Sequence, residues 1–188
     1  MTNRAPGDFW EFSLAFYARP GVAEACVGLQ DEYALDVNVL LLALYAGRRH
    51  IALGAADFAS LERTVRAWRR QAVVPLRRVR RGIRPMLQAM PGIAREAYDA
   101  VKQAELADER VQQACMEQWL TARGGPADAC AGPAGTEGVD GRSGQAADLC
   151  CVSNLDAYLR SRRRARDAGL DARLQVLREA LRALLQAG

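Results

Sequence analysis

The sequence of 188 residues has few of the residues on which common catalytic and metal sites depend. His50 is the one histidine, so a His-based zinc site or a Glu-x-x-His di-iron site lacks its second histidine. No serine lies in a G-x-S-x-G turn, and the chain has no phosphate loop and no dinucleotide fingerprint. We therefore expect no catalytic residue, no metal and no cofactor, and an enzyme is the less favoured interpretation.

Long apolar runs are also missing. A membrane span needs roughly 18 consecutive apolar residues, and the best candidate, residues 37–46, is interrupted by Asn38. The segment MTNRAPGDFWEF carries Asp8 and no uninterrupted apolar run, unlike a secretory signal. We expect a cytoplasmic protein with no membrane contact. The five cysteines, an odd number without C-x-x-C spacing, favour ordinary reduced thiols, and the sequence assigns no role to the Cys150 and Cys151 pair.

The apolar residues that are present recur at helical spacing, and no alternating run predicts a strand. The predicted fold class is all-α, with a compact helical bundle over residues 8–122 and a C-terminal helical hairpin over residues 148–187 packed on it. Residues 123–147 between them are rich in glycine and small side chains and are predicted to be a flexible connection. The leucine-rich face of the hairpin could also pair with a second copy, which would make a homo-oligomer.

Local signals place several helix boundaries. Asp36 and Asp57 each precede an apolar run and are predicted N-caps. Pro75 predicts a kink or break near residues 72–74, because it lacks an N–H and clashes with the preceding turn. A further helix is predicted over residues 91–120, with an apolar side made of Ala97, Val101, Ala104, Val111 and Cys115.

Positive charge is concentrated in one stretch. Nine arginines and no carboxylate lie between Arg63 and Arg84, although the net charge of the whole chain is only +4. Such a stretch attracts phosphate, an acidic partner or an acidic face of its own fold. Three interpretations stay open: contact with RNA or the ribosome, contact with an acidic protein, or neutralisation by Glu105, Asp108 and Glu109. The candidate partner-binding residues are Arg66, Arg70, Arg77, Arg78, Arg81 and Arg84.

Two groups of polar residues are candidates for a site. One group stands in apolar surroundings, and the other forms a row on one helical face. Gln30, Asp31, Asp36 and Asn38 flank one predicted helix corner, where they either form a hydrogen-bond network or line a site. Lys102, Glu105 and Glu109 share one helical face, which is either exposed or, if it faces Arg77, Arg78 or Arg81, part of an interhelical network.

The same acidic residues suggest a second function. Asp31 with Asp36 and Glu105 with Glu109 could hold Mg²⁺ for a diphosphate substrate, although no DDxxD-like element is present. A pocket near these residues would make the protein a ligand-binding protein or a magnesium-dependent enzyme.

Three blocks resemble an uncharacterised family of bacterial cytosolic proteins known only as a domain of unknown function. They are FWEFSLAFYARPGVAEACVGLQDEYALDVNVLLLALY at 9–45, WRRQAVVPLRRVRRGIR at 68–84 and VKQAELADER at 101–110. The resemblance spans residues 8–120 and implies a compact helical domain without an established activity. Ala34 replaces a glycine of the pattern and Arg84 a lysine, so a left-handed C-cap is not predicted at residue 34. The recurring polar positions of the family correspond to Gln30, Asp31, Asp36, Asn38, Arg77, Arg81, Lys102, Glu105 and Glu109.

Together these patterns predict a non-catalytic interaction or adaptor protein that uses its arginine-rich helical face to contact RNA, the ribosome or an acidic protein. The alternative is the ligand-binding protein described above.

Overall fold

The computed structural model describes residues 8–123 and 141–186, and every regular element in these ranges is a helix. The all-α prediction is therefore confirmed, while residues 124–140 of the predicted flexible connection lie outside the described residues. In chain order the elements are α1 (Asp8–Tyr17), α2 (Val22–Tyr33), α3 (Val37–Arg48), α4 (Ala55–Trp68), the π-helical η1 (Arg69–Val73), α5 (Val74–Ile83), α6 (Met86–Ala89), α7 (Pro91–Ala122), α8 (Gly141–Ser161) and α9 (Ala168–Gln186).

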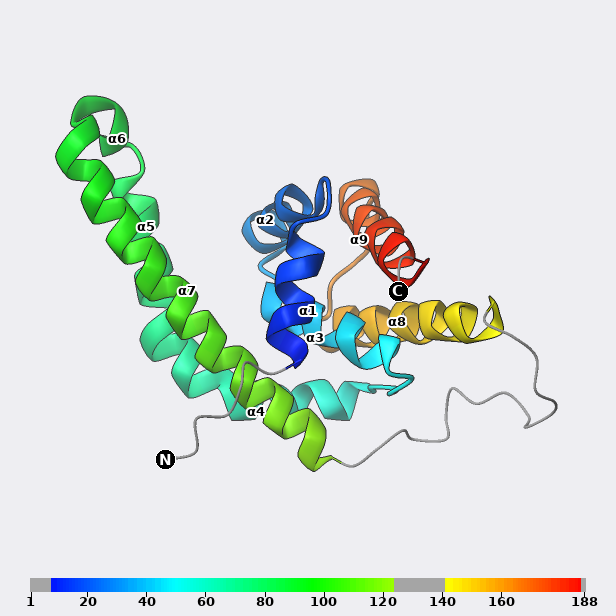
Figure 1. Ribbon diagram of the computed structural model, residues 1–188. Coiled ribbons are helices and arrows are strands. Elements are labelled where there is room, and N and C mark those ends of the chain that lie inside the picture. Colours follow the sequence, from blue (N-terminus) through cyan, green and yellow to red (C-terminus); the bar gives the residue numbers. More distant parts are fainter. Residues whose placement is uncertain (1–7, 124–140, 187–188) are drawn as a thin grey trace.

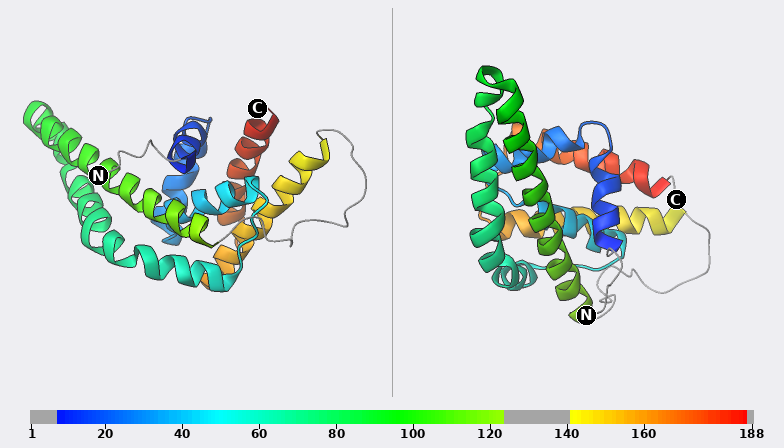
Figure 2. Two further views of the ribbon diagram at one scale, coloured as in Figure 1. Left: turned by 60° about the horizontal axis from the view of Figure 1, so that its bottom comes forward. Right: turned by 60° about the vertical axis from the view of Figure 1, so that its left-hand side comes forward.

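Helix α3 forms the centre of the molecule. Its sequence is apolar on almost every side, and all residues from Val37 to Gly47 are buried. A helix of this kind has to be surrounded by other elements. Helices α1, α2, α7 and α8 supply that cover, α4 packs on α7 and α8, and α9 packs on α2 (Figures 1 and 2).

A long helical hairpin packs against the other helices, α1, α2, α3, α8 and α9, which we call the body, and extends beyond them. One limb is the continuous helix α4–η1–α5, the other is α7, and α6 joins them at the tip (Figure 1). We call this hairpin the arm. The half of α7 nearer its C-terminus packs on α1 and α3, so the helix packing between the arm and the body lies toward one end of the arm (Figure 2).

The predicted disruption before Pro75 takes the form of a π-helical segment. Residues Arg69–Val73 are π-helical, and the Val74 N–H donates to the Arg69 carbonyl five residues earlier. Proline lacks an N–H, so one bond of the α-helical series is lost at this point in any case, and a wider turn accommodates its ring. The limb therefore continues through the segment, with its register rotated, instead of breaking.

Two of the helix ends differ from expectation. Asp36 caps α3 as predicted, since its Oδ1 accepts from the Asn38 N–H at 3.0 Å. Asp57, however, is not an N-cap, because α4 begins at Ala55 and Gly54 precedes it. Asp57 is the third residue of the helix, and its carboxylate accepts from the Gly54 N–H at 2.8 Å. Ala34 does adopt the left-handed conformation, with φ 53°, and its N–H donates to the Leu29 carbonyl. Alanine takes this strained position because the corner into α3 requires it.

The inward face of α7 matches the predicted one only in part: Cys115 packs against the core and Val101 is half-buried. Ala97, Ala104 and Val111 are exposed, and the buried positions are instead polar in its middle and apolar at its end. They are Ala94, Glu105, Gln112, Gln113, Met116 and Leu120. The apolar pattern failed at the other positions because the arm and the body bury a charged network here, which hydrophobic periodicity cannot detect.

Helix α8 begins inside the predicted connection, at Gly141. The glycines at 141 and 144 disfavour a helix locally, but burial of Ala147, Cys150 and Cys151 in the core compensates for that cost. Asn154 is fully buried, and its amide donates to the carbonyls of residues 43 and 51 and accepts from the N–H of residue 53. Helix α8 thereby holds the connection between α3 and α4.

The leucines that suggested a homo-oligomer lie inside the molecule. Leu170, Leu174, Leu177 and Leu181 of α9 are all fully buried in the core of their own chain. A second copy would have to dock on other residues of the hairpin, so the homo-oligomer stays a prediction, which sedimentation would test.

Candidate functional site

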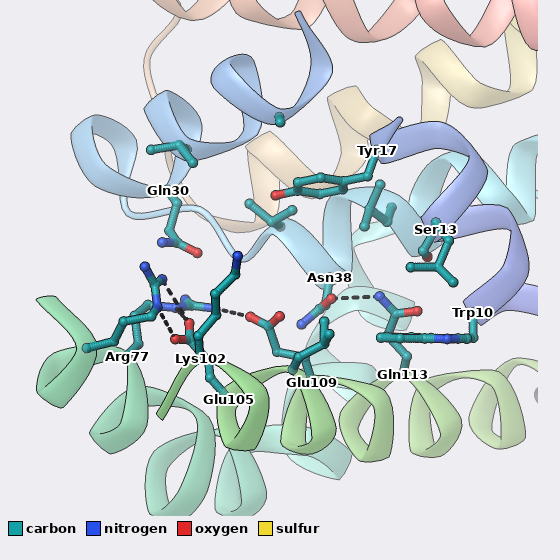
Figure 3. A pocket seen from close by; sticks show the side chains of 17 residues that line it. Trp10, Ser13, Tyr17, Gln30, Asn38, Arg77, Lys102, Glu105, Glu109 and Gln113 are labelled. Atoms are coloured by element: carbon teal, nitrogen blue, oxygen red, sulfur yellow. Dashed lines mark hydrogen bonds and ion pairs between the residues drawn. The ribbon is translucent and has the colours of Figure 1, made fainter. Parts of the chain in front are cut away.

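A cleft of about 520 Å³ opens between the arm and the body. Helices α1, α2 and α3 form one side of it, and α5 and α7 form the other (Figure 3). Its apolar walls include several side chains that are unusually exposed for their type, among them Leu14, Val27 and Leu106. The full set of apolar lining residues is Trp10, Leu14, Tyr17, Ala23, Val27, Val37, Leu41 and Leu106. The volume is in the range of pockets that hold small molecules.

The same cleft collects most of the polar candidates from the sequence. They come from α2, α3, α5 and α7, and they are Gln30, Asn38, Arg77, Lys102, Glu105 and Glu109. Figure 3 shows these side chains converging along α7 and the facing helices. The corner group and the row on α7 were separate in the sequence, and the fold brings them together.

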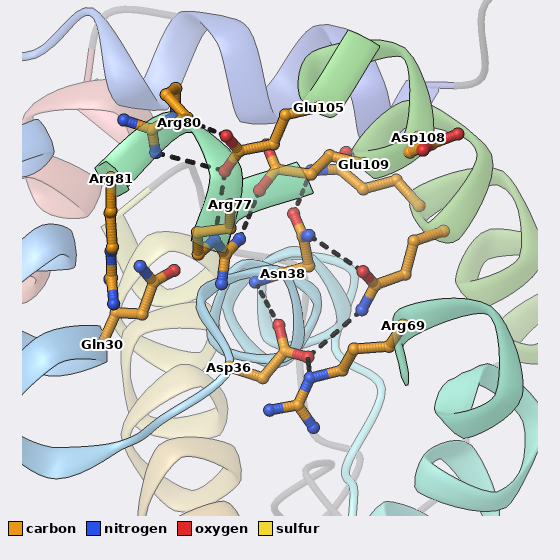
Figure 4. Close-up of polar contacts among 12 residues, drawn as sticks. Gln30, Asp36, Asn38, Arg69, Arg77, Arg80, Arg81, Glu105, Asp108 and Glu109 are labelled. Atoms are coloured by element: carbon orange, nitrogen blue, oxygen red, sulfur yellow. Dashed lines mark hydrogen bonds and ion pairs between the residues drawn. The ribbon is translucent and has the colours of Figure 1, made fainter. Parts of the chain in front are cut away.

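Glu105 is the centre of the ionic network. Its carboxylate is buried between two arginines of the opposite limb, with Arg77 Nε at 3.1 Å and Arg80 in a bidentate contact (Figure 4). Burial on its own raises the pKa of this carboxyl, but the hydrogen bonds from Arg80 and Arg77 outweigh that effect and hold the pKa below its ordinary value. Glu105 is therefore charged and neutralised within the fold.

Glu109 shares Arg77 but differs in its titration. Arg77 Nη2 lies 2.5 Å from Glu109 Oε1. Burial raises the pKa of Glu109, and this effect exceeds the lowering by Arg77, while the nearby charges of Glu105 and Asp36 raise it further. One arginine thus serves two carboxylates, and Glu109 is the less well compensated of the two.

Lys102 also lines the cleft but takes no part in the ionic network of Arg77, Arg80, Glu105 and Glu109. Its side chain is exposed, and within the part of the chain that the structure describes it has no ion-pair or hydrogen-bond partner. It reaches from α7 into the cleft (Figure 3). The charged lining comprises three cations, Arg77, Arg80 and Lys102, against the carboxylates Glu105 and Glu109. The cleft therefore has an excess of one positive charge.

Asp36 and Asn38 serve mainly to fix the beginning of α3 (Figure 4). Asp36 Oδ2 lies 2.9 Å from Arg69 Nε and accepts from Gln112 Nε2 at 3.2 Å. Asn38 accepts from Gln113 Nε2 at 2.8 Å and donates to Gln112. Buried polar groups of this kind need partners, and here η1, α3 and α7 supply them to one another. These bonds tie the beginning of α3, whose Asn38 lines the cleft, to η1 and α7.

Asp31 does not line the cleft, although its neighbour Gln30 does. Asp31 forms an ion pair with Arg81 of α5, and both side chains are about half exposed. The Gln30 amide lies 3.4 Å from the Asp31 carboxylate. An exposed pair contributes little to stability, but this one links α2 to the arm across the cleft.

The six candidate arginines divide into two groups. Arg77 and Arg81 are paired with carboxylates as described above. The others, Arg66, Arg70, Arg78 and Arg84, are exposed and have no ion pair with a described residue. The expectation of internal neutralisation therefore applies to part of the stretch, and Asp108 takes part only through its backbone carbonyl, which accepts from Trp68 Nε1 at 3.0 Å.

The sequence analysis missed several residues of the site. Arg80 was omitted although it contacts Glu105, and Gln112 and Gln113 were not singled out. Spacing could have found the two glutamines, since they follow Glu105 and Glu109 at helical intervals on one face. Gln113 Oε1 is buried and has no hydrogen-bond partner among the described residues. Nothing in the sequence marked Trp10 as part of the cleft wall.

The geometry does not favour the magnesium interpretation. Each of the four carboxylates is paired with a guanidinium group, which cancels the negative charge that would attract a dication. The described residues also contain no cluster of three or more His, Cys, Asp or Glu side chains suited to a metal.

The fold and site define an all-helical protein with an amphipathic, positively biased cleft at the base of a projecting arm. The chain belongs to a family described as protein of unknown function (DUF2390), whose model matches residues 8–116. The match covers the whole cleft and excludes α8 and α9. No curated protein and no solved structure matches the chain. Among the described helices, none has the length and apolar character needed to cross a bilayer.

Proposed function

We propose that this protein is a non-catalytic, cytoplasmic binding protein, and that its binding site is the cleft between the arm and the body. One observation carries this proposal. Polar side chains from five helices meet in a single cleft whose other lining residues are apolar, several of them exposed. A binding pocket typically combines mostly apolar walls with a few convergent polar groups. The ligand-binding function is therefore favoured over the adaptor function for the residues of the cleft.

Binding of a fluorescent apolar anion would test the proposal. Anilinonaphthalene sulfonate has an apolar body and one negative charge, and it should bind the full chain with a single site and a rise in its emission. Val27 lies in the cleft wall with 51% of its surface exposed, so Val27→Glu should place a charge in the cleft without unfolding the protein. This variant should lose most of the binding.

Ile93→Glu is the matched control. Ile93 is 81% exposed on the arm and does not line the cleft, so the same substitution there should leave probe binding unchanged. Equal losses in both variants would mean that the probe responds to exposed apolar surface in general, and the cleft would then not be the binding site.

A second candidate function, contact with RNA or the ribosome, rests on the outer face of the arm. Arg63, Arg66, Arg70 and Arg78 recur at helical spacing along α4–η1–α5, and all four are exposed without an ion pair to a described residue. Such a row could follow a phosphate backbone. An acidic protein is the competing partner for the same face.

The dependence of RNA affinity on salt concentration tests the RNA version of this function. An RNA duplex should bind the natural chain with an affinity that falls steeply as salt rises, and Arg66→Glu/Arg70→Glu should abolish that response. Arg162→Glu/Arg164→Glu makes the same change in net charge in another exposed segment and should retain most of the binding. A flat salt response would remove the RNA version, and an acidic protein partner would remain to be tested by affinity capture with and without nuclease.

A further inference from the structure

We infer that the ligand of the cleft is an amphipathic monocarboxylate: a molecule with one carboxylate, held by Lys102, and an extended apolar body packed against α1 and α2. This inference rests on the proposed function of the cleft and specifies the chemistry of its ligand.

The charge of the cleft selects a monoanion. Arg77 and Arg80 are already engaged with Glu105 and Glu109, so they are not available to a ligand without breaking the network. Lys102 remains, exposed and without a partner among the described residues. One carboxylate neutralises the single positive charge in excess. A phosphate monoester carries between about −1.5 and −2 charges near neutral pH and would leave negative charge beside Glu105 and Glu109.

The opposite wall selects an apolar body. Leu14 of α1 and Val27 of α2 line this wall together with Tyr17, and each exposes about half of its surface. Apolar surface of this kind gains free energy when a ligand removes it from water. Trp10 of α1 adds to this wall, and Leu106 of α7 adds apolar surface on the facing side, so an elongated chain or flat ring would cover more of the lining than a compact ion would.

A cation or a neutral molecule fits less well. An amine would lie beside Lys102 and both arginines, whose charges are only partly compensated by the carboxylates. A neutral chain would gain the apolar contacts but would leave the ammonium group of Lys102 partly desolvated and without a partner.

Calorimetric titration of the full chain with four ten-carbon probes tests the ligand class: decanoate, decanol, decyl phosphate and decyltrimethylammonium. Decanoate should bind most tightly, at least threefold more tightly than decanol, because it adds an ion pair to the same apolar contacts. Shortening the chain to octanoate should weaken binding about tenfold, as expected for two buried methylenes.

Variants of Lys102 assign the carboxylate to its position. Lys102→Gln should weaken decanoate binding about threefold to tenfold and leave decanol unaffected. Lys102→Glu should reverse the preference, so that decyltrimethylammonium binds more tightly than decanoate. Arg164→Gln, an exposed charge removal outside the cleft, should behave like the natural chain with every probe.

The outcomes separate the ligand class from the existence of the site. If decanol and decanoate bind equally, or if decyl phosphate binds most tightly, the monocarboxylate inference is wrong while the cleft remains a binding site. Unchanged decanoate affinity in Lys102→Gln would also overturn it. If no probe binds and anilinonaphthalene sulfonate is insensitive to Val27→Glu, then the proposed function itself fails.

Discussion

Arg77 and Arg78 are neighbours in the chain but lie in opposite environments. Successive residues of a helix point about 100° apart, so Arg77 faces α7 and pairs with Glu105 and Glu109 while Arg78 faces solvent. A count of charges along the sequence gives both residues equal weight. Only the orientation of the helix, which the π-helical segment helps to set, separates the neutralised arginines from the exposed ones.

Glu105 should make the free energy of unfolding fall as the pH is lowered into the acid range. Its pKa is lower in the folded chain than in the unfolded chain, so its contribution is fully present above about pH 4.3 and is lost as the pH falls through the folded value. Glu105→Gln should lower the free energy of unfolding by about 2 kcal/mol at pH 7. Urea unfolding at pH 7 and at lower pH should show a flatter acid dependence in this variant.

Glu109→Gln is the control for that measurement, because the contribution of Glu109 to stability changes with pH in the opposite direction. The folded pKa of Glu109 is raised, so its contribution is present below the ordinary glutamate pKa and is lost as the pH rises through the folded value. Replacing it should cost less than about 1 kcal/mol at pH 7. Equal losses in the two variants would contradict the assignment of Glu105 as the centre of the network.

Ala34 offers a test of backbone strain. It holds a left-handed conformation with φ 53°, which costs alanine about 1 kcal/mol more than glycine. Ala34→Gly should therefore raise the free energy of unfolding by about 1 kcal/mol, and Ala67→Gly, at an exposed position inside α4, should lower it by a similar amount. Thermal unfolding should show a higher melting temperature for Ala34→Gly and a lower one for Ala67→Gly. Destabilisation by Ala34→Gly would contradict the strain argument.

At the scale of elements, α3 and α8 cross at very close range. A Cβ atom added to Gly47 would lie 2.5 Å from Cys151 Sγ and 2.6 Å from the Cys151 backbone. The backbone of a packed helix cannot move aside cheaply. Gly47 is therefore required by the contact between two helices.

Gly47→Ala should destabilise the protein by about 2 to 3 kcal/mol, because α8 has to shift away from α3. Gly82→Ala is the matched change: Gly82 lies within α5, and an added Cβ there meets no atom within 4 Å. This control should be stabilising by about 0.5 to 1 kcal/mol through helix propensity. Chemical denaturation measures both, and a neutral Gly47→Ala would show that the crossing is looser than described.

Sequence patterns predicted the elements better than their faces. An apolar run with its cap located α3, and apolar periodicity located α7, because these signals are local. The inward side of α7 was predicted correctly only near Cys115, since Glu105, Gln112 and Gln113 are buried only because other helices bring them partners. Likewise, the candidate polar residues were identified individually, but their meeting in one cleft depends on how the arm packs on the body. Contacts between residues so distant in sequence leave no local signal.

At the scale of the molecule, the residues outside the family match complete the core. Cys151, Leu155 and Tyr158 of α8 are buried against α3 and α4, and the Tyr158 hydroxyl accepts from the Asp36 N–H at 3.0 Å. Burial and the nearby charge of Asp36 raise the pKa of Tyr158 above its ordinary value. The bundle of residues 8–123 therefore exposes much of α3 when α8 is absent.

A chain that ends at residue 123 should not unfold cooperatively on heating, because α3 loses its largest apolar cover. Circular dichroism during a thermal scan would show this as a shallow, gradual loss of helix. Adding a separate fragment of residues 124–188 should restore a cooperative transition. A sharp transition of the truncated chain as a monomer would show instead that the N-terminal helices form an independent domain.

Cys26 gives the cleft an internal reporter. Its side chain is fully buried on α2 next to Tyr17, and burial raises the pKa of its thiol to about 12, despite the hydrogen bond with Tyr17 that lowers it. An alkylating reagent reacts with the thiolate, which is scarce here at neutral pH. Alkylation of Cys26 thus requires the helices packed on α2 to move away from it, and its rate, followed by peptide mass spectrometry, measures how often the structure opens beside Tyr17 of the cleft wall.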